Sequence, residues 1–214
     1  MPKYQLKFTA QQVAELPAHL FPGDGNEAVA LVLCGRLDAG DILFGCMDTV
    51  DGRDLLNRLA TFYAIPYFDL GVRLDADGHG RVDVACGSVH YLLPGGSSLL
   101  SRGTYTPEAL RAATRRRTNP EQYKSELAEG YLKGVKVESP AVISVNGLCA
   151  TLAINNLLAR FQPFRIEPNS EMRHQWFDLI NGVFGSGASE SPCRVLQRYA
   201  GRGDMEPFLD CYLG

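Results

Sequence analysis

The feature that most constrains the fold lies between residues 42 and 72. Residues 42–47 are a short apolar segment that ends at Asp48, and residues 51–63 carry a helical pattern with one apolar face. Residues 65–72 form a second strand candidate directly afterwards. Two strands joined by a helix of roughly three turns are typical of a βαβ unit, because parallel strands need a crossover connection. The chain is therefore predicted to be an α/β protein with a parallel core.

The later part of the chain extends this core. Residues 81–93 alternate between apolar and other side chains, which predicts an antiparallel extension of the same sheet. Residues 94–139 are polar, loop-rich and partly helical, and they include the basic run 115–117, which is typical of a solvated helix face. Helical spacing then predicts a long helix over residues 143–161 that packs against the sheet. One more strand is expected at 173–179, followed by a Gly/Ser-rich loop over 182–191.

The first forty residues form a separate segment. Residues 4–9 alternate like a strand, and residues 10–20 read as a short helix interrupted by Pro17. Residues 22–26 are turn-forming, and residues 28–34 are a continuous apolar run that suits a buried strand.

Composition excludes several classes of partner. The net charge of −3 and the pI near 5.8 argue against nucleic acid or an anionic membrane as partner. No apolar run approaches the roughly 20 residues of a membrane span, and the amino terminus has no signal-like apolar core. The six cysteines include no CxxC pair, so we expect a reduced, cytoplasmic protein in which most thiols are buried. These residues are Cys34, Cys46, Cys86, Cys149, Cys193 and Cys211.

Four stretches, taken in order, resemble the ThiF/MoeB/HesA family of adenylyltransferases, which share the ubiquitin-activating-enzyme-like fold. The first is FGCMDTVDGR at 44–53 with Asn57 after it, which is similar to the family pattern D-x-x-x-x-R-x-x-x-N. The others are IPYFDLG at 65–71, YLLPGG at 91–96 and PAVISVNG at 140–147. The resemblance spans roughly residues 42–210 and implies an incomplete Rossmann-like ThiF fold with a mixed sheet.

The family resemblance implies a reaction. Such enzymes use ATP to activate a carboxylate, often the carboxy terminus of a ubiquitin-like or sulfur-carrier protein, and commonly form homodimers. Asp48 matches the aspartate that binds Mg²⁺, so it is the candidate catalytic, metal and ATP-site residue. Arg53 and Asn57 match framework positions and are the further catalytic and cofactor-binding candidates, respectively. Alternatively, Asp48 caps the following helix, and Arg53 and Asn57 form a carboxylate pair or plain helix surface.

The chain departs from the family pattern at two places. No segment before residue 42 supplies the GxGxxG turn that holds the ATP phosphates, since residues 22–27 lack a third glycine in register. The family's zinc-binding CxxC pairs align with Ser98 and Ser101 and with Cys193 and Leu196, so structural zinc is predicted to be absent. No cysteine matches a thioester-forming residue, and Cys149 is expected to face the core.

Residues 26–35 resemble, more weakly, the opening of a JAB/MPN metalloprotease domain, with Glu27 at its general-base position. The H-x-H zinc pair of that family is missing, because all four histidines are isolated. JAB–ThiF fusions occur in bacteria, so the chain reads as such a fusion with its middle lost near residues 38–41, whether by natural decay, deletion or misjoining. The predicted domains are a JAB/MPN-like fragment at 1–40 and a partial ThiF-like domain at 41–214. An impaired adenylyltransferase and a non-catalytic binding module both remain open.

Overall fold

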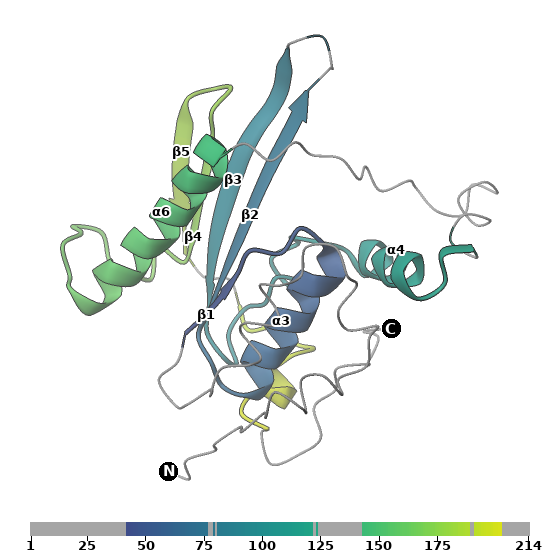
Figure 1. Cartoon of the computed structure of the whole chain (residues 1–214). Coiled ribbons are helices and arrows are strands. Elements are labelled where there is room, and N and C mark those ends of the chain that lie inside the picture. Colours follow the sequence, from purple (N-terminus) through teal and green to yellow (C-terminus); the bar gives the residue numbers. More distant parts are fainter. Residues whose placement is uncertain are drawn as a thin grey trace, which may run out of the picture.

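The protein is an α/β structure built on one five-stranded mixed sheet (Figure 1). The computed structural model describes residues 42–76, 79, 81–121, 123, 143–188 and 191–202. The expected amino-terminal elements and the fragment at 1–40 lie outside these residues. The strands follow one another in sequence order across the sheet; β1 and β2 are parallel and the other neighbours are antiparallel. They are β1 (Leu43–Gly45), β2 (Tyr67–Ala76), β3 (Val82–Leu92), β4 (His174–Asp178) and β5 (Val183–Gly187).

The predicted βαβ unit is confirmed. Helix α3 (Val50–Phe62) joins β1 to β2, and the register pairs Gly45 with Asp69. The helix begins after Thr49, whose side-chain oxygen accepts a hydrogen bond from the Gly52 N–H at 3.2 Å. It ends where Ala64 adopts a left-handed φ of 56°, so that the Ile65 N–H can reach the Ala60 carbonyl at 2.8 Å. This tight end brings β2 back beside β1.

Alternation along the strands separates two apolar cores on the two faces of the sheet. Tyr67 points to the face that α3 covers, whereas Phe68 points to the face covered by α6 (Ile143–Phe161). The α3-side core includes Leu43, Leu56, Leu59, Tyr67, Leu92, Leu99 and Tyr105. The α6-side core includes Phe68, Leu70, Leu74, Ala85, Val89, Cys149 and Phe177. Because strands β2 and β3 contribute to both cores, they form the centre of the molecule.

The antiparallel extension is also confirmed. Strand β2 pairs with β3 from Tyr67 opposite Leu92 to Ala76 opposite Val82, with a register shift at Asp75/Ala76. The two strands project past the end of α3, so no described helix lies against their far half on the α3 side (Figure 1). The expected loop over 182–191 was wrong in its first part, because residues 183–187 pair with β4 as strand β5.

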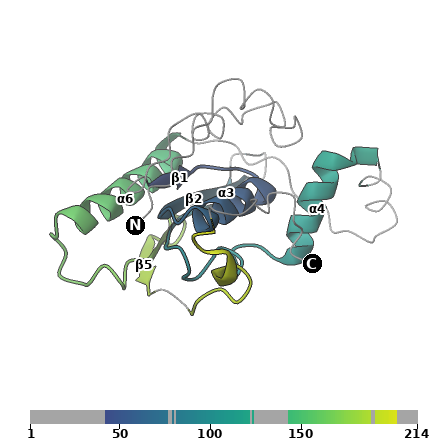
Figure 2. The ribbon, with the colours of Figure 1, turned by 90° about the horizontal axis from the view of Figure 1, so that it is seen from below.

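The region between β3 and α6 contains α4 (Pro107–Thr118), which packs beside α3. Arg117 at the end of α4 donates to Asp51 at the start of α3 over 2.7 Å, while Arg115 and Arg116 are exposed. The basic run is therefore a largely solvated face, as expected, and its last member pairs with α3. Buried Asp54 ties the loop before α4 to α3, because it accepts from Tyr105 Oη at 2.6 Å. Seen from below, α4 and α6 lie at opposite ends of the molecule (Figure 2).

The bounds of α6 agree with the predicted 143–161, and Cys149 faces the core as expected. Leu158 and Phe161, which belong to the apolar residues at helical spacing, point outward and are exposed. The helix instead packs on the sheet through Val145, Cys149, Ala153, Asn156 and Ala159. Short side chains at these positions let the helix approach the strands closely. Among the described helices, none is long and apolar enough to cross a membrane.

Candidate functional site

Asp48 lies exposed just beyond the carboxyl end of β1, at the start of α3. It makes no hydrogen bond or ion pair with other described residues. The alternative that Asp48 caps α3 is wrong, because Thr49 is the capping residue. The Asp48 carboxylate thus faces solvent at the strand end where ligands gather in open α/β sheets.

Arg53 and Asp69 form an ion pair between α3 and β2. The Arg53 Nε lies 3.1 Å from Asp69 Oδ1 and 3.2 Å from Oδ2, and Nη2 donates to Oδ2. Tyr67 Oη donates to Asp69 Oδ1 at 2.8 Å, so the fully buried carboxylate is shared by two donors. Burial lowers the pKa of Arg53, but the hydrogen bond and charge of Asp69 raise it above its usual value. Burial and the Asp69 charge hold the pKa of Tyr67 well above its usual range.

Arg53 therefore forms the Arg–carboxylate pair that was one of the alternatives from the sequence. Part of its guanidinium nevertheless remains accessible to solvent. Its side chain in this pair is 17% exposed, and Nη1 makes no hydrogen bond to the described residues. The guanidinium lies against Gly71, where an added Cβ would sit 3.1 Å from Nη2. Glycine at position 71 thus leaves space for Arg53 on the open face of β2.

Asn57 is buried inside α3 and is occupied by internal contacts. Its Oδ1 accepts from the Leu99 N–H at 2.7 Å, and its Nδ2 donates to Thr61 Oγ1 at 3.4 Å. These bonds fix the loop that follows β3 against α3. The geometry gives Asn57 a framework role and no direct path to a cofactor.

Two thiols lie close to these carboxylates. Cys46, which follows β1, is exposed, and its pKa is raised first by partial burial and then by the charges of Asp69 and Asp48. Cys149 on α6 is buried; burial and the neighbouring Cys46 raise its pKa to about 11. Both thiols stay protonated at neutral pH, which does not suit a nucleophile.

Two stacked histidines lie on the β3 side of the Arg53–Asp69 ion pair. His90 on β3 lies opposite Asp69 in register, and its ring stacks on that of His174 with 4.1 Å between centroids. Arg102 Nη1 lies 3.4 Å from His90 Nδ1 and donates to the Arg173 carbonyl at 3.0 Å. Burial, followed by the positive charge of His174 and Arg102, lowers the pKa of His90 to about 2. His90 is therefore a neutral structural group.

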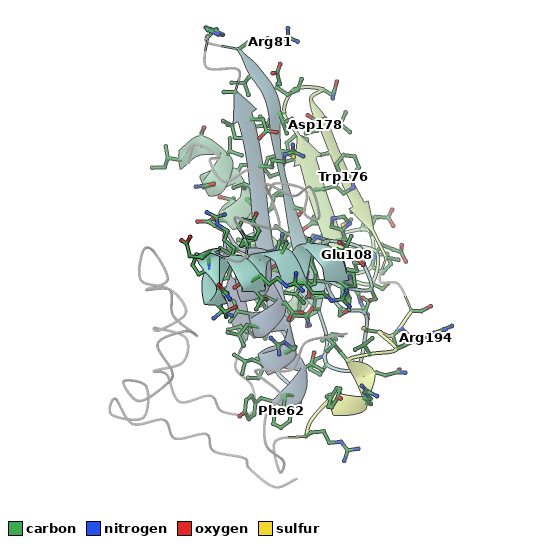
Figure 3. All side chains as sticks on the ribbon, turned by 90° about the vertical axis from the view of Figure 1, so that its right-hand side faces the viewer. Phe62, Arg81, Glu108, Trp176, Asp178 and Arg194 are labelled. Carbon is green, nitrogen blue, oxygen red and sulfur yellow. The ribbon has the colours of Figure 1, made fainter. Side chains whose placement is uncertain are left out.

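Beyond Arg53, no described helix covers the same face of the sheet. Gly71, Ser88, Trp176 and Gly185 are register partners across four strands and share this face. The Trp176 indole lies across Gly185, where a Cβ would collide with it. Figure 3 shows Trp176 and Asp178 along β4, above α4 in that view. We call these four residues the sheet row. They form a shallow surface with one half-exposed aromatic ring.

The segments expected to replace the family's zinc site do meet. The Cys193 N–H donates to the Gly96 carbonyl at 2.9 Å. The Ser101 N–H donates to Ser98 Oγ at 3.1 Å, and the Ser98 N–H donates to Ser101 Oγ at 2.9 Å. Cys193 and Leu196 are buried. In the described part of the chain, no cluster of three or more His, Cys, Asp or Glu side chains is placed to hold a metal ion.

No protein-family model matches the chain, and no curated protein matches its sequence. The site is therefore interpreted from its own geometry. The sequence pattern pointed to Asp48, Arg53 and Asn57; in the structure Asp48 and Arg53 lie near the beginning of α3, whereas Asn57 is buried farther along the helix. The pattern missed Asp69 and Tyr67, although an acid within the apolar segment 65–72 is a usable signal for a buried ion pair.

Proposed function

We propose that the chain is an impaired ThiF-type adenylyltransferase-family protein. In this reaction the carboxy terminus of a ubiquitin-like or sulfur-carrier protein attacks the α-phosphate of ATP, and pyrophosphate leaves. The observation that carries the proposal is the exposed Asp48 carboxylate, which pairs with no other described residue, at the carboxyl end of parallel strand β1. Bound Mg²⁺ would neutralise charge on the phosphates as the bond to pyrophosphate breaks.

The neighbourhood of Asp48 supports a phosphate ligand only in part. Arg53 offers its Nη1, which makes no hydrogen bond to the described residues, on a guanidinium that Asp69 holds in place. Asp48 favours a cation at this helix end over a bare phosphate, whereas Asp51 in the first turn of α3 is already paired with Arg117. The described residues thus fit one carboxylate ligand of a hydrated Mg²⁺ and contain no phosphate cradle. In this proposal a second chain supplies the cradle.

The sheet row fits the protein partner. A carboxy-terminal tail of small residues can lie on a shallow face formed by Gly71 and Ser88, and Trp176 offers an apolar contact beside it. The row continues from Gly71, which the Arg53 guanidinium contacts, so the tail would end next to Asp48 and Arg53.

A second candidate is a non-catalytic module that uses the sheet row to bind such a partner without turnover. The occupied Asn57 side chain favours it, because one of the three residues carried over from the family pattern is closed to a ligand.

Calorimetry with Mg²⁺ and ATP, on the chain alone and together with a family member whose GxGxxG half is intact, tests the proposal. We expect measurable binding that Asp48→Ala weakens on the order of tenfold or more, because a carboxylate ligand of the ion is lost. Asp83→Ala is the matched control. Asp83 is an exposed carboxylate on β3, distant from Asp48 in the sequence, and it pairs with Arg81. Binding that is absent, or equally weakened by both variants, leaves the non-catalytic module as the function.

A further inference from the structure

Three arginines gather where α6 ends and the chain turns back to β4, on the face of the sheet that α6 covers (Figure 1). Arg160 is in the last turn of α6, and its guanidinium carbon lies 3.6 Å from the centre of the Tyr91 ring. Arg165 lies in the loop, and its Nη1 is 3.4 Å from Asn156 Oδ1. Arg173 directly precedes β4, and alternation along the strand turns its side chain toward α6. We call these three residues the arginine cluster.

Shared contacts with the backbone hold the arginine cluster together. The Met172 carbonyl accepts from Asn156 Nδ2 at 2.9 Å and from Arg160 Nη2 at 3.4 Å. Arg173 is the next residue, and its carbonyl accepts from the Tyr91 N–H at 2.7 Å. The Tyr91 ring is the one that Arg160 covers. The guanidiniums are therefore neighbours, although they come from a helix, a loop and the start of a strand.

The arginine cluster has no acidic partner among the described residues. None of its members forms an ion pair with a described carboxylate, and the acids nearest to it in the sequence, Glu167 and Glu171, are exposed. Burial lowers the pKa of Arg160; Tyr91 opposes this effect, and the charges of the other two arginines lower the pKa further. Partly buried cations that face only one another repel, so this group lacks a counter-charge.

Two donors of the arginine cluster are buried and unpaired. The Nε atoms of Arg160 and Arg173 make no hydrogen bond to any described residue. A buried donor on a charged group is costly to leave without an acceptor. The neutral alternatives are Asn169 Oδ1 and Gln175 Oε1, two buried acceptors that also lack described partners. After small rotations they would satisfy the hydrogen bonds, but they would leave the positive charges uncompensated.

We propose that the arginine cluster binds a phosphate group. Guanidiniums that arrive from three elements suit a tetrahedral anion, whose oxygens point in different directions, better than a planar carboxylate. The anion accepts from both Nε atoms and supplies the missing negative charge. This site lies on the α6 face of the sheet, whereas Asp48 lies at the start of α3, so it is separate from the ATP site proposed above.

Two sources can supply this phosphate. Inorganic phosphate or a small phosphate ester can enter beside Arg165, which is only partly buried. A phospholipid headgroup is the other source, because exposed apolar side chains lie on either side of Arg165 in the sequence and can enter a lipid surface. Phe161, Phe164 and Ile166 are 69%, 62% and 101% exposed, respectively. Both sources present the same phosphate chemistry to the guanidiniums.

Calorimetry with inorganic phosphate on the full chain tests the site. We expect a Kd below about 1 mM, and Arg165→Gln should weaken binding on the order of tenfold or more, because a charge-assisted contact is lost. Arg198→Gln is the matched control and should leave binding unchanged. Arg198 is an exposed arginine after β5 in the chain, and its guanidinium carbon lies 4.8 Å from the centre of the Tyr199 ring. Sodium acetate at the same ionic strength should bind at least about tenfold more weakly than phosphate.

Thermal unfolding separates a binding site from a merely structural cluster. Without phosphate, Arg165→Gln should leave the melting temperature unchanged or raise it, because one of several like charges is removed. With excess phosphate, the unsubstituted chain should gain stability and the variant should not, since the ligand binds the folded state. Asp48→Ala should keep the phosphate effect, so this result does not depend on the proposed adenylyltransferase function.

Co-sedimentation with phosphatidylcholine vesicles, with and without phosphatidic acid, distinguishes the two sources. Binding that requires phosphatidic acid and is lost in Arg165→Gln assigns a lipid headgroup, whereas calorimetric binding without co-sedimentation assigns a free phosphate or small ester. The proposal is overturned if the chain binds neither these vesicles nor inorganic phosphate up to about 10 mM. It is also overturned if acetate binds as well as phosphate, or if Arg198→Gln weakens binding as much as Arg165→Gln.

Discussion

At the scale of single residues, Arg53 and Asp69 are unequal partners. Asp69 is fully buried, whereas the Arg53 side chain keeps some contact with solvent. We expect Arg53→Met to lower the free energy of unfolding by about 3–5 kcal/mol, because it leaves a buried carboxylate with only Tyr67 as donor. Asp69→Asn should cost less, about 1–3 kcal/mol, since the arginine can turn toward water. Urea unfolding near pH 7 measures both.

The matched control is Arg73→Met. Arg73 pairs with Asp75 on the same strand β2, with Nη2 2.5 Å from Oδ2, but its side chain is largely exposed. An exposed pair contributes about 0–1 kcal/mol, so this variant should change stability little. Equal losses for Arg53→Met and Arg73→Met would contradict the view that burial makes the first pair important.

His90 predicts a pH dependence. Its pKa is about 2 in the folded protein and near 6.5 when unfolded. Above the unfolded value both states are neutral, and below it only the unfolded state takes up the proton. Stability should therefore fall as pH drops from about 6.5, by up to about 1.4 kcal/mol per pH unit. His90→Gln should reduce this slope between pH 6 and pH 4; unfolding measured at several pH values compares the variant with the unsubstituted chain.

At the scale of one element, the two residues before α3 differ in role: Thr49 caps the helix and Asp48 does not. Thr49→Ala should destabilise the protein by about 1 kcal/mol, because the Gly52 N–H loses its acceptor. Asp48→Ala should change stability by less than about 0.5 kcal/mol, since it removes an exposed side chain that caps nothing. Thermal unfolding of the two variants measures this. A larger loss at Asp48 than at Thr49 would return Asp48 to a structural role.

The elements also show what the sequence can predict. Periodicity placed the βαβ unit and the ends of α6, because long runs of apolar residues at fixed spacing have few alternatives. It could not orient α6, since Leu158 on one side and the small Ala153 on the other are both apolar. Strand β5 was read as loop because Gly185 and Gly187 are turn-formers; Gly185 is instead needed beneath the Trp176 ring. The position of Asp48 followed from the pattern. Its lack of a partner among the described residues, and the Arg53–Asp69 contact, depend on segments that are distant in the sequence.

At the scale of the whole molecule, the β2–β3 pair is covered unequally. Near Phe68 and Val89 it lies between the two cores, with α3 on one face and α6 on the other. Toward Ala76 and Val82 it runs beyond α3, and only the α6 side is packed. Opening the far half exposes less apolar surface, so it should need less free energy than opening the centre.

Hydrogen exchange followed by mass spectrometry tests this difference. Amides of residues 67–70 and 89–92 should exchange only on global unfolding. Those of residues 72–76 and 82–86 should open at a free energy lower by roughly 2 kcal/mol or more, although they belong to the same ladder. Uniform protection along both strands would mean that something covers the open face in solution. Since the sheet row lies on that face, protection that rises when a carrier protein is added would place the partner there.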